Sequence, residues 1–488
     1  MKELTYPKEL KSLGHLVIDG ERVPSLSGAS IAVLDPATGG TVAQVPGGEA
    51  DDIDRAVGAA RSALKGPWRA LDPTERGRVL MTFAALIRRD VEVLTRIECL
   101  DVGKPLSQAR RDVLRAAAYI EFYAGMADKL NGESVPLGDG KTAFTLLEPV
   151  GVTGHILPWN YPISTLARGL GPALACGNTV VAKPAEQTPL TSIMLGVLFT
   201  EAGGPNGVFN VVTGYGETAG AALAEHPDIA HLTFTGSTET GRSVMRAAAG
   251  PLAGVTLELG GKSPIVVMDD ADLDAAAAGV ARGIFFNAGQ ICTAGSRLIV
   301  GRPVYNQLVS KVVERAEALA IGHGFDDPDL GPLVSAEQLR RVSAYVERAS
   351  KAGMSVLTGG ERVFPESLEG GTFYGPTVLI DVPVDAEIAQ DEVFGPVLCV
   401  HVVDDFDEAV AVANATRYGL VAGIYTKDVS RAMRFARKAE AGQIFVNGYL
   451  AAGDTVPFGG MKESGIGREK GVAALMNYCE IKAVTISH

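Results

Sequence analysis

Three residues from different parts of the chain have side chains suited to nucleophilic chemistry on a carbonyl group. Cys292 lies in FFNAGQICTAGSR between two glycine turns, where small neighbours leave its sulfur approachable. Glu258 interrupts the apolar stretch VTLELGGKSPIVV, and a carboxylate in such surroundings acquires the raised pKa of a general base. Asn160 lies in the proline-bounded turn PWNYP, where its amide could donate to an oxyanion. The alternative for the cysteine is a buried, inert thiol, the commonest state of this residue type.

A second group of residues has the character of a dinucleotide site. The turn FTGSTETG leads from an apolar stretch into a helical pattern, so Gly236, Ser237 and Gly241 would surround a helix N-terminus, which attracts pyrophosphate. This turn is not a GxGxxG fingerprint, and an ordinary strand-to-helix turn explains it about equally well. Lys183 and Glu186 follow the apolar stretch NTVVAKP, where the carboxylate could hold the hydroxyls of an adenosine ribose. A surface ion pair is the alternative there.

The elements that position these residues follow from the hydrophobic pattern. From about 147 to 270, short apolar stretches alternate with helical segments, which predicts a parallel α/β sheet with right-handed crossovers. Ligands of such sheets bind beyond the carboxyl ends of the strands. The strands predicted here are GVTGHIL, NTVVAKP, GVFNVVTG, HLTFTG and PIVVMDD. A second α/β passage, from about 271 to 440, has strands near LIVGR, PTVLIDV, VLCVHVV, AGIYT and GQIFVNG.

The composition narrows the classes of function. With 488 residues the chain is long enough for more than one domain, and a net charge of −13 argues against a nucleic-acid or anionic-membrane surface. The N-terminus is too charged for a signal peptide and no long apolar run occurs, which predicts a cytoplasmic protein that does not span a membrane. The spacing of the cysteines and histidines predicts neither disulfides nor a metal site. The acidic run at 269–274 is expected to cap a helix rather than bind calcium.

Seven motifs closely resemble, in order and at the usual spacing, those of the aldehyde dehydrogenase superfamily. The similarity covers nearly the whole chain. It implies an α/β fold with a Rossmann-like cofactor domain, an α/β catalytic domain and a small β oligomerisation element. The motifs are PWNYP (158–162), GPALACGNTVVAKPAEQTP (171–189), FTGSTETG (234–241), LELGGKSP (257–264), FFNAGQICTAGSR (285–297), DEVFGPV (391–397) and PFGGMKESGIGRE (457–469).

The resemblance also implies a role for each residue at the site. Cys292 matches the nucleophile, Glu258 the general base, and Asn160 with the backbone N–H of Cys292 the oxyanion hole. The implied cofactor contacts are Lys183, Glu186, Gly236, Ser237, Gly241, Glu392, Phe394 and Trp159. The implied substrate tunnel is lined by Arg168, Tyr161, Ala452 and Phe458.

These roles imply the oxidation of an aldehyde to a carboxylic acid. The Cys292 thiolate attacks the carbonyl, the thiohemiacetal loses hydride to the nicotinamide, and water activated by Glu258 hydrolyses the thioester. The acylating branch of the family typically lacks this glutamate, so its presence favours hydrolysis. A non-catalytic protein on the same fold and a thiol esterase without redox activity are the competing hypotheses.

The preferred cofactor follows from charge. Glu186 near the adenosine 2′ position would bind a hydroxyl but repel a phosphate, so we expect NAD rather than NADP. The neighbouring Lys183 leaves some NADP binding possible.

The substrate depends on residues in which this chain departs from well-known relatives. Many enzymes that oxidise simple aldehydes carry Trp at the position of Arg168, whereas relatives resembling succinate semialdehyde dehydrogenase carry Arg there to hold a carboxylate. Ala452 replaces an aromatic residue of many relatives, which should widen the tunnel. We therefore expect a bulky, aromatic or carboxylate-bearing aldehyde. An Arg168 that turns away to pair with an acidic neighbour is an equally weighted alternative.

The resemblance finally divides the chain into domains. Residues 1–127 and 147–257 form the NAD-binding domain, 258–440 the catalytic domain, and 128–146 with 441–488 the anchor loop and oligomerisation segments. The hairpin near 128–146 and the terminal strand CEIKAVTIS make up the oligomerisation element. An apolar terminal strand needs an edge to pair with, and in this family a neighbouring subunit supplies it. A homodimer or homotetramer is therefore expected.

Overall fold

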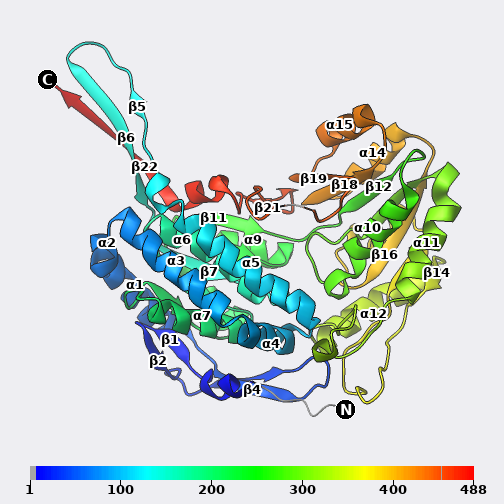
Figure 1. Ribbon diagram of the computed structural model, residues 1–488, viewed down its shortest axis with the longest axis horizontal. Helices are drawn as coiled ribbons and strands as arrows, with labels where there is room; N and C mark the ends of the chain where they lie inside the picture. Colours follow the sequence, from blue (N-terminus) through cyan, green and yellow to red (C-terminus); the bar gives the residue numbers. More distant parts are fainter. Residues whose placement is uncertain (1–6, 452) are drawn as a thin grey trace.

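The computed structural model describes residues 7–451 and 453–488, so the prediction for Ala452 lies outside the described residues. The chain forms two α/β bodies, and a thin β arm projects from the first of them (Figure 1). The first body holds the helices of the N-terminal half, and the second holds those that follow residue 272. This architecture confirms the predicted α/β class.

The sheet of the first body has the strand order of a Rossmann-like fold. Five parallel strands lie in the order β9-β8-β7-β10-β11, so the chain order reverses between β7 and β10. Ligands bind beyond the carboxyl ends of the strands at such a switch point. In spatial order the strands are β2 (Glu21–Val23), β1 (Leu16–Ile18), β9 (Phe209–Val211), β8 (Thr179–Lys183), β7 (Val152–Ile156), β10 (His231–Thr235), β11 (Gly254–Glu258) and β21 (Gly465–Ile466).

Helices cover both faces of this sheet, and strand β8 shows why. Val180 and Ala182 join the apolar core formed with α3, α5, α6 and α7, whereas Val181 joins the core formed with α1. A strand buried on both faces is a continuous apolar run rather than an alternating one. The helices are α1 (Ala50–Lys65), α2 (Pro67–Ala70), α3 (Pro73–Arg89), α4 (Val91–Val102), α5 (Leu106–Ala124), α6 (Pro162–Ala175), α7 (Leu190–Glu201), α8 (Ala221–Glu225) and α9 (Thr238–Ala248).

The second body contains a sheet that is parallel except for one edge strand. Our grouping of PIVVMDD with the strands of the first passage is wrong, because residues 259–263 carry the chain from β11 into this sheet. The sheet also extends past the predicted boundary at 440, since GQIFVNG supplies its other edge. Its strands are β14 (Ser355–Thr358), β15 (Thr377–Ile380), β16 (Val397–Val403), β13 (Arg297–Gly301), β12 (Pro264–Val267), β18 (Val421–Tyr425) and β19 (Gln443–Val446). Its helices are α10 (Leu273–Phe285), α11 (Tyr305–Glu317), α12 (Ala336–Lys351), α13 (Glu387–Gln390), α14 (Phe406–Asn414) and α15 (Val429–Lys438).

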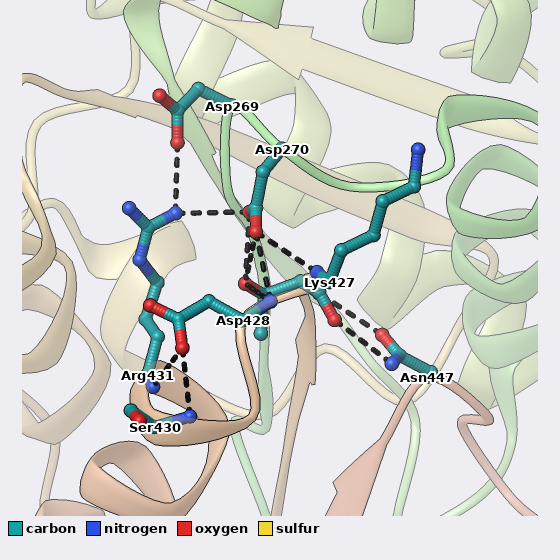
Figure 2. A network of polar contacts seen from close by, with 8 residues as sticks. Asp269, Asp270, Lys427, Asp428, Ser430, Arg431 and Asn447 are labelled. Atoms are coloured by element: carbon teal, nitrogen blue, oxygen red, sulfur yellow. Dashed lines mark hydrogen bonds and ion pairs between the residues drawn. The ribbon is translucent and has the colours of Figure 1, made fainter.

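The acidic run at 269–274 is structural, as Figure 2 shows for its first half. Asp270 accepts hydrogen bonds from Thr426, from the main-chain N–H groups of Lys427 and Asp428, and from Arg431. It therefore ties the end of β12 to the loop that follows β18. Asp272 caps the N-terminus of α10 by accepting from two main-chain N–H groups, which confirms the predicted helix cap.

The arm consists of β5 (Ser134–Val135), β6 (Lys141–Pro149) and β22 (Cys479–Ser487). The terminal strand β22 pairs with β6 of its own chain in an unbroken antiparallel register from Cys479–Pro149 to Ser487–Lys141. We expected a neighbouring subunit to supply the strand that pairs with β22. For the edge of β22 that faces β6 this expectation is wrong, because β6 belongs to the same chain. Pairing with the chain's own hairpin satisfies the main-chain groups along one edge of β22, whereas its other edge pairs with no strand of the described residues.

A short C-terminal segment joins the two bodies. β20 (Met461–Lys462) pairs with β17 (Tyr418–Gly419) of the second body, and β21 pairs with β11 of the first. Between them, Ser464 donates to the carbonyl of Gly260 and accepts from the N–H of Gly419. Both bodies are therefore hydrogen-bonded to one stretch of six residues, 461–466. A separate hairpin, β3 (Ser30–Leu34) and β4 (Thr41–Pro46), belongs to neither sheet.

None of the described helices is both long enough and apolar enough to cross a membrane.

Candidate active site

The two bodies enclose a cavity of about 270 Å³. The segments that follow β7, β10 and β11 line it from the first body, and the segments that precede β13 and β16 line it from the second. The carboxyl edge of one sheet thus faces the amino edge of the other. The predicted residues that lie in its wall are Cys292, Glu258, Asn160, Trp159, Gly236, Ser237, Glu392, Phe394, Arg168, Tyr161 and Phe458.

Cys292 lies half-buried in the loop between α10 and β13. The short helix before it is η4 (Phe286–Gly289). In this helix Asn287 and Ala288 have φ values of 51° and 53°, which are left-handed conformations typical of a tight turn. Within the described residues, the main-chain N–H of Cys292 donates no hydrogen bond, so it is available to an oxyanion. Burial raises the pKa of the thiol to about 12, and the charge of Arg168 opposes this rise.

Glu258 ends strand β11 with its side chain 2% exposed. Neither carboxylate oxygen has a hydrogen-bond partner among the described residues. Burial raises the pKa of this carboxyl well above its usual value, and the charge of Glu469 raises it further. A Cβ atom at Gly459 would lie 2.9 Å from Oε1 of Glu258, so the glycine leaves room for the carboxylate. Such a carboxylate has a high proton affinity and, among the described residues, no hydrogen-bond partner that would account for its burial.

Asn160 is held by one hydrogen bond through its side chain and another through its main chain. Its side-chain Nδ2 donates to the carbonyl of Gln290 at 2.9 Å, two residues before the thiol. Its main-chain carbonyl accepts from Nζ of Lys104 at 2.9 Å, and this buried ammonium also donates to Asp112 at 2.6 Å. The amide group is therefore fixed beside Cys292. One of its two N–H donors is used, which leaves the second for a ligand.

The glycine turn after β10 opens helix α9. Ser237 is the N-cap residue, and its hydroxyl accepts from the main-chain N–H of Thr240 at 3.2 Å. A side chain at Gly236 would lie 2.5 Å from the Phe234 ring, so the turn approaches the strand closely. Gly241 has a different task, because it packs α9 against Leu259 and does not belong to the cavity wall.

Lys183 ends β8 and Glu186 lies three residues beyond it; both are outside this cavity wall, and they interact with each other. Nζ of Lys183 lies 3.3 Å from Oε2 of Glu186. The lysine is 3% exposed and the glutamate half-buried, which is not the plain surface ion pair considered as an alternative. Burial lowers the pKa of the Lys183 ammonium, and Glu186 counteracts this effect.

A second carboxylate and two aromatic rings lie on the opposite wall. Glu392 accepts from the main-chain N–H of Gly261 at 3.0 Å, and burial raises its pKa to about 7. Phe394 adopts a left-handed conformation with φ of 58°. Its ring meets that of Trp159 edge-on, with 5.2 Å between the centroids. These residues come from the segments before β16 and after β7, so they join the two bodies across the cavity.

Arg168 lines the cavity and is ion-paired at the same time. Its guanidinium contacts Glu469, donates to Thr235 at 3.3 Å and lies 5.4 Å from the centroid of the Phe458 ring. Arg168 thus pairs with an acidic neighbour, which is one of the two alternatives that the sequence left open. Its charge is largely balanced before any substrate arrives.

Sequence reasoning did not single out three charged residues near the site: Lys104, Glu469 and Lys470. Lys104 holds Asn160, and Glu469 holds Arg168. Glu469 ends the motif PFGGMKESGIGRE and Lys470 follows it, so their position was a usable signal. Lys104 follows a glycine outside every recognised motif, so nothing local marked it. In the part of the chain that the structure describes, no group of three or more His, Cys, Asp or Glu residues could hold a metal ion.

Comparison with known proteins agrees with this geometry. A sequence model of the aldehyde dehydrogenase family matches residues 23–484. An aldehyde dehydrogenase of Emericella nidulans is 44% identical over 471 residues, which cover 96% of this chain and 94% of the relative. A mitochondrial benzaldehyde dehydrogenase of Antirrhinum majus is 43% identical and covers 96% of this chain and 88% of its own. The NAD⁺ complex of a Bacillus cereus aldehyde dehydrogenase superposes with a TM-score of 0.96, at 41% identity over 99% of both chains. The chain therefore belongs to the aldehyde dehydrogenase family.

Proposed function

We propose that the protein oxidises an aldehyde to the carboxylic acid with NAD as the electron acceptor. One observation carries the proposal: the Cys292 thiol, the Glu258 carboxylate and the Asn160 amide all line one cavity. A nucleophile, a base and an oxyanion donor in one cavity are what acyl chemistry on a thiol requires. A non-catalytic homologue would have no reason to keep all three.

Each of these groups has a distinct task in the mechanism. The sulfur of Cys292 attacks the aldehyde carbonyl, and the resulting oxyanion accepts hydrogen bonds from the free N–H of Cys292 and from Nδ2 of Asn160. Glu392, Phe394 and Trp159 would hold the nicotinamide, which would supply the acceptor for the hydride that leaves the substrate carbon, so that the acyl group stays on the sulfur as a thioester. Glu258 then takes a proton from water as this water attacks the thioester. Its raised pKa, caused by burial, makes it a stronger base than a solvated glutamate.

The residues around the switch point fit a dinucleotide. The N-terminus of α9 offers main-chain N–H groups behind Ser237, and the absence of a side chain at Gly236 lets a ligand approach the turn. Glu186 lies at the carboxyl end of the neighbouring strand, where it can hold ribose hydroxyls. Glu392, Phe394 and Trp159 would hold the nicotinamide end beside the thiol.

We expect NAD to be used in preference to NADP by about tenfold or more in kcat/KM, because Glu186 repels a 2′-phosphate. Glu186→Gln removes the repulsion and should reduce the preference by about tenfold. Steady-state kinetics with each cofactor measures both effects. The matched control is Glu225→Gln on the exposed end of α8, which should leave the ratio unchanged. A wild-type preference for NADP would contradict the assignment.

The direct test of the proposed function is the rise in nicotinamide absorbance when the protein, NAD and a panel of aldehydes are mixed. The panel should span aliphatic, aromatic, amino and carboxylate-bearing aldehydes, and the acid product is identified by mass spectrometry. Ester hydrolysis alone, without NAD reduction, would support the rival thiol esterase. The many aromatic side chains of the cavity and the benzaldehyde dehydrogenase among its relatives favour a bulky or aromatic substrate.

We also propose that a second copy of the chain covers the arm, as the expected homodimer or homotetramer requires. Ile481 on β22 and Val135 on β5 lie on one face of the arm and are 63% and 40% exposed, and Ile486 on the other face is 49% exposed. Apolar side chains on a projecting sheet are stabilised by burial against a partner.

Replacing Ile481 and Val135 together by Asp should shift the protein to a smaller assembly, because two charges would enter the covered face. Size-exclusion chromatography with light scattering measures the mass of each variant. Leu252→Asp, at an apolar residue 89% exposed but far from the arm in sequence, is the control and should leave the mass unchanged. Wild-type protein of monomeric mass would contradict this proposal.

A further inference from the structure

Lys470 is a cation of the cavity wall that forms no ion pair within the described residues. It follows Glu469, whose main chain pairs with that of Phe458, and it adopts a left-handed conformation with φ of 61°. Its ammonium lies 4.8 Å from the centroid of the Phe458 ring and 5.9 Å from that of Tyr119. Across residues 7–451 and 453–488, this ammonium forms neither an ion pair nor a hydrogen bond.

The two arginines whose charges act on this lysine are each paired. Arg115 contacts Asp454 at 3.0 Å, and Arg168 contacts Glu469. Burial, together with repulsion from Arg168 and Arg115, lowers the pKa of Lys470 to about 8. Lys470 is therefore the cation of this part of the wall whose ammonium has no ion-pair partner within the described residues.

The surroundings of Lys470 suit an anion that arrives with an apolar body. The faces of Phe458 and Tyr119 stabilise the ammonium through their π-electrons, but a ring face leaves its N–H donors free for a ligand. A carboxylate beside the ammonium would replace repulsion by attraction and would raise the lysine pKa again. The aromatic rings would contact the rest of the ligand.

We propose that Lys470 binds a carboxylate carried by the aldehyde substrate at the end remote from the carbonyl, so that an acidic aldehyde is the preferred substrate. This inference rests on the proposed aldehyde oxidation and names its substrate class. The substrate carboxylate would bind to Lys470 rather than to Arg168, because Arg168 is already paired with Glu469.

The test compares 4-formylbenzoate with 4-formylbenzamide, which have nearly the same shape but differ in charge. Wild-type protein should oxidise the benzoate with a higher kcat/KM. Lys470→Met should lower kcat/KM for the benzoate by about 10-fold to 100-fold, mainly through KM, and change that for the benzamide less than about threefold. Lys470→Arg keeps the charge and should retain most of the preference. Lys351→Met removes an exposed lysine on α12 and is the matched control.

A pH profile of the wild-type protein tests the same point without any substitution. Lys470 is protonated below its pKa of about 8, so the preference for the benzoate should be complete at pH 7 and decline as the pH rises towards 9.5. In Lys470→Arg the preference should not decline, because arginine stays charged. The titratable and charged groups that face this lysine are Arg168 from α6, Arg115 and Tyr119 from α5, Asp454 from the anchor loop, and Glu469, Glu258 and Cys292.

Two failures of this experiment have different meanings. If wild-type protein reduces NAD with neither substrate nor with any other aldehyde, the proposed function fails. If it oxidises both compounds but shows no preference that depends on Lys470 or on pH, the function stands and the carboxylate site is refuted. Equal losses for both substrates in Lys470→Met would likewise refute the site, because they indicate a structural role.

Discussion

Replacing Cys292 by serine is expected to lower kcat by about 10⁴-fold or more while leaving NAD binding intact. Serine has nearly the same shape, but its hydroxyl gives up a proton far less readily than a thiol and is a poor nucleophile without a strong base. The readouts are steady-state NADH formation and the dissociation constant of NAD by calorimetry. Cys479→Ser, at the half-buried thiol that begins β22, is the control and should retain full activity.

The same thiol can be examined by chemical modification. Because burial raises the pKa of Cys292 to about 12, the thiolate fraction of the cofactor-free protein is small at pH 7. The rate of alkylation by iodoacetamide should therefore increase about tenfold for each pH unit from 7 towards 10. A rate that is already constant at pH 7 would show that the thiol is ionised in the cofactor-free site.

Replacing Glu258 by glutamine is the second large effect that we expect, a loss of about 10²-fold to 10⁴-fold in kcat. Thioester hydrolysis needs the base, whereas hydride transfer comes before it. The variant should therefore still release a burst of about one NADH per active site, followed by slow turnover. Stopped-flow absorbance measures the burst, and mass spectrometry should detect the acyl group on Cys292.

A small external nucleophile separates this explanation from a general loss of structure. Hydroxylamine attacks a thioester without a base, so it should restore part of the turnover of Glu258→Gln. It should have little effect on Cys292→Ser, which forms no thioester. A Glu258→Gln variant without a burst would place the glutamate before hydride transfer and contradict the assigned role.

Much of the fold could be predicted because its strands are buried on both faces. Continuous apolar runs such as that of β8 are bounded by polar or glycine-rich turns. The site residues lie in the turns after the strands of the first sheet and in the segments before the strands of the second. Strand pairing was less predictable. The pattern of PIVVMDD is the same in either sheet, and only the crossing at 259–263 decides which one it joins. The terminal strand posed a similar problem, because its apolar pattern predicts pairing but not the chain that provides the partner.

The positions of the site residues were predictable where the residues lie in a recognised motif. They were less predictable where a long, flexible side chain can reach several partners. Cys292, Glu258 and Asn160 are fixed by strand ends and turns, and all three line the cavity. An arginine or lysine reaches several positions, so the pairing of Arg168 with Glu469 and the isolation of Lys470 depend on contacts between α6 and the C-terminal segment. Such contacts have no signature in either sequence stretch alone.

The segment 461–466 couples the unfolding of one body to the unfolding of the other. Unfolding either body would break the main-chain pairing of β20 or β21 and release Ser464, which bonds to Gly260 and Gly419. Elements coupled in this way open as one cooperative unit rather than as separate ones. The binding energy of a dinucleotide on the first sheet is therefore shared by the second, which carries the nucleophile.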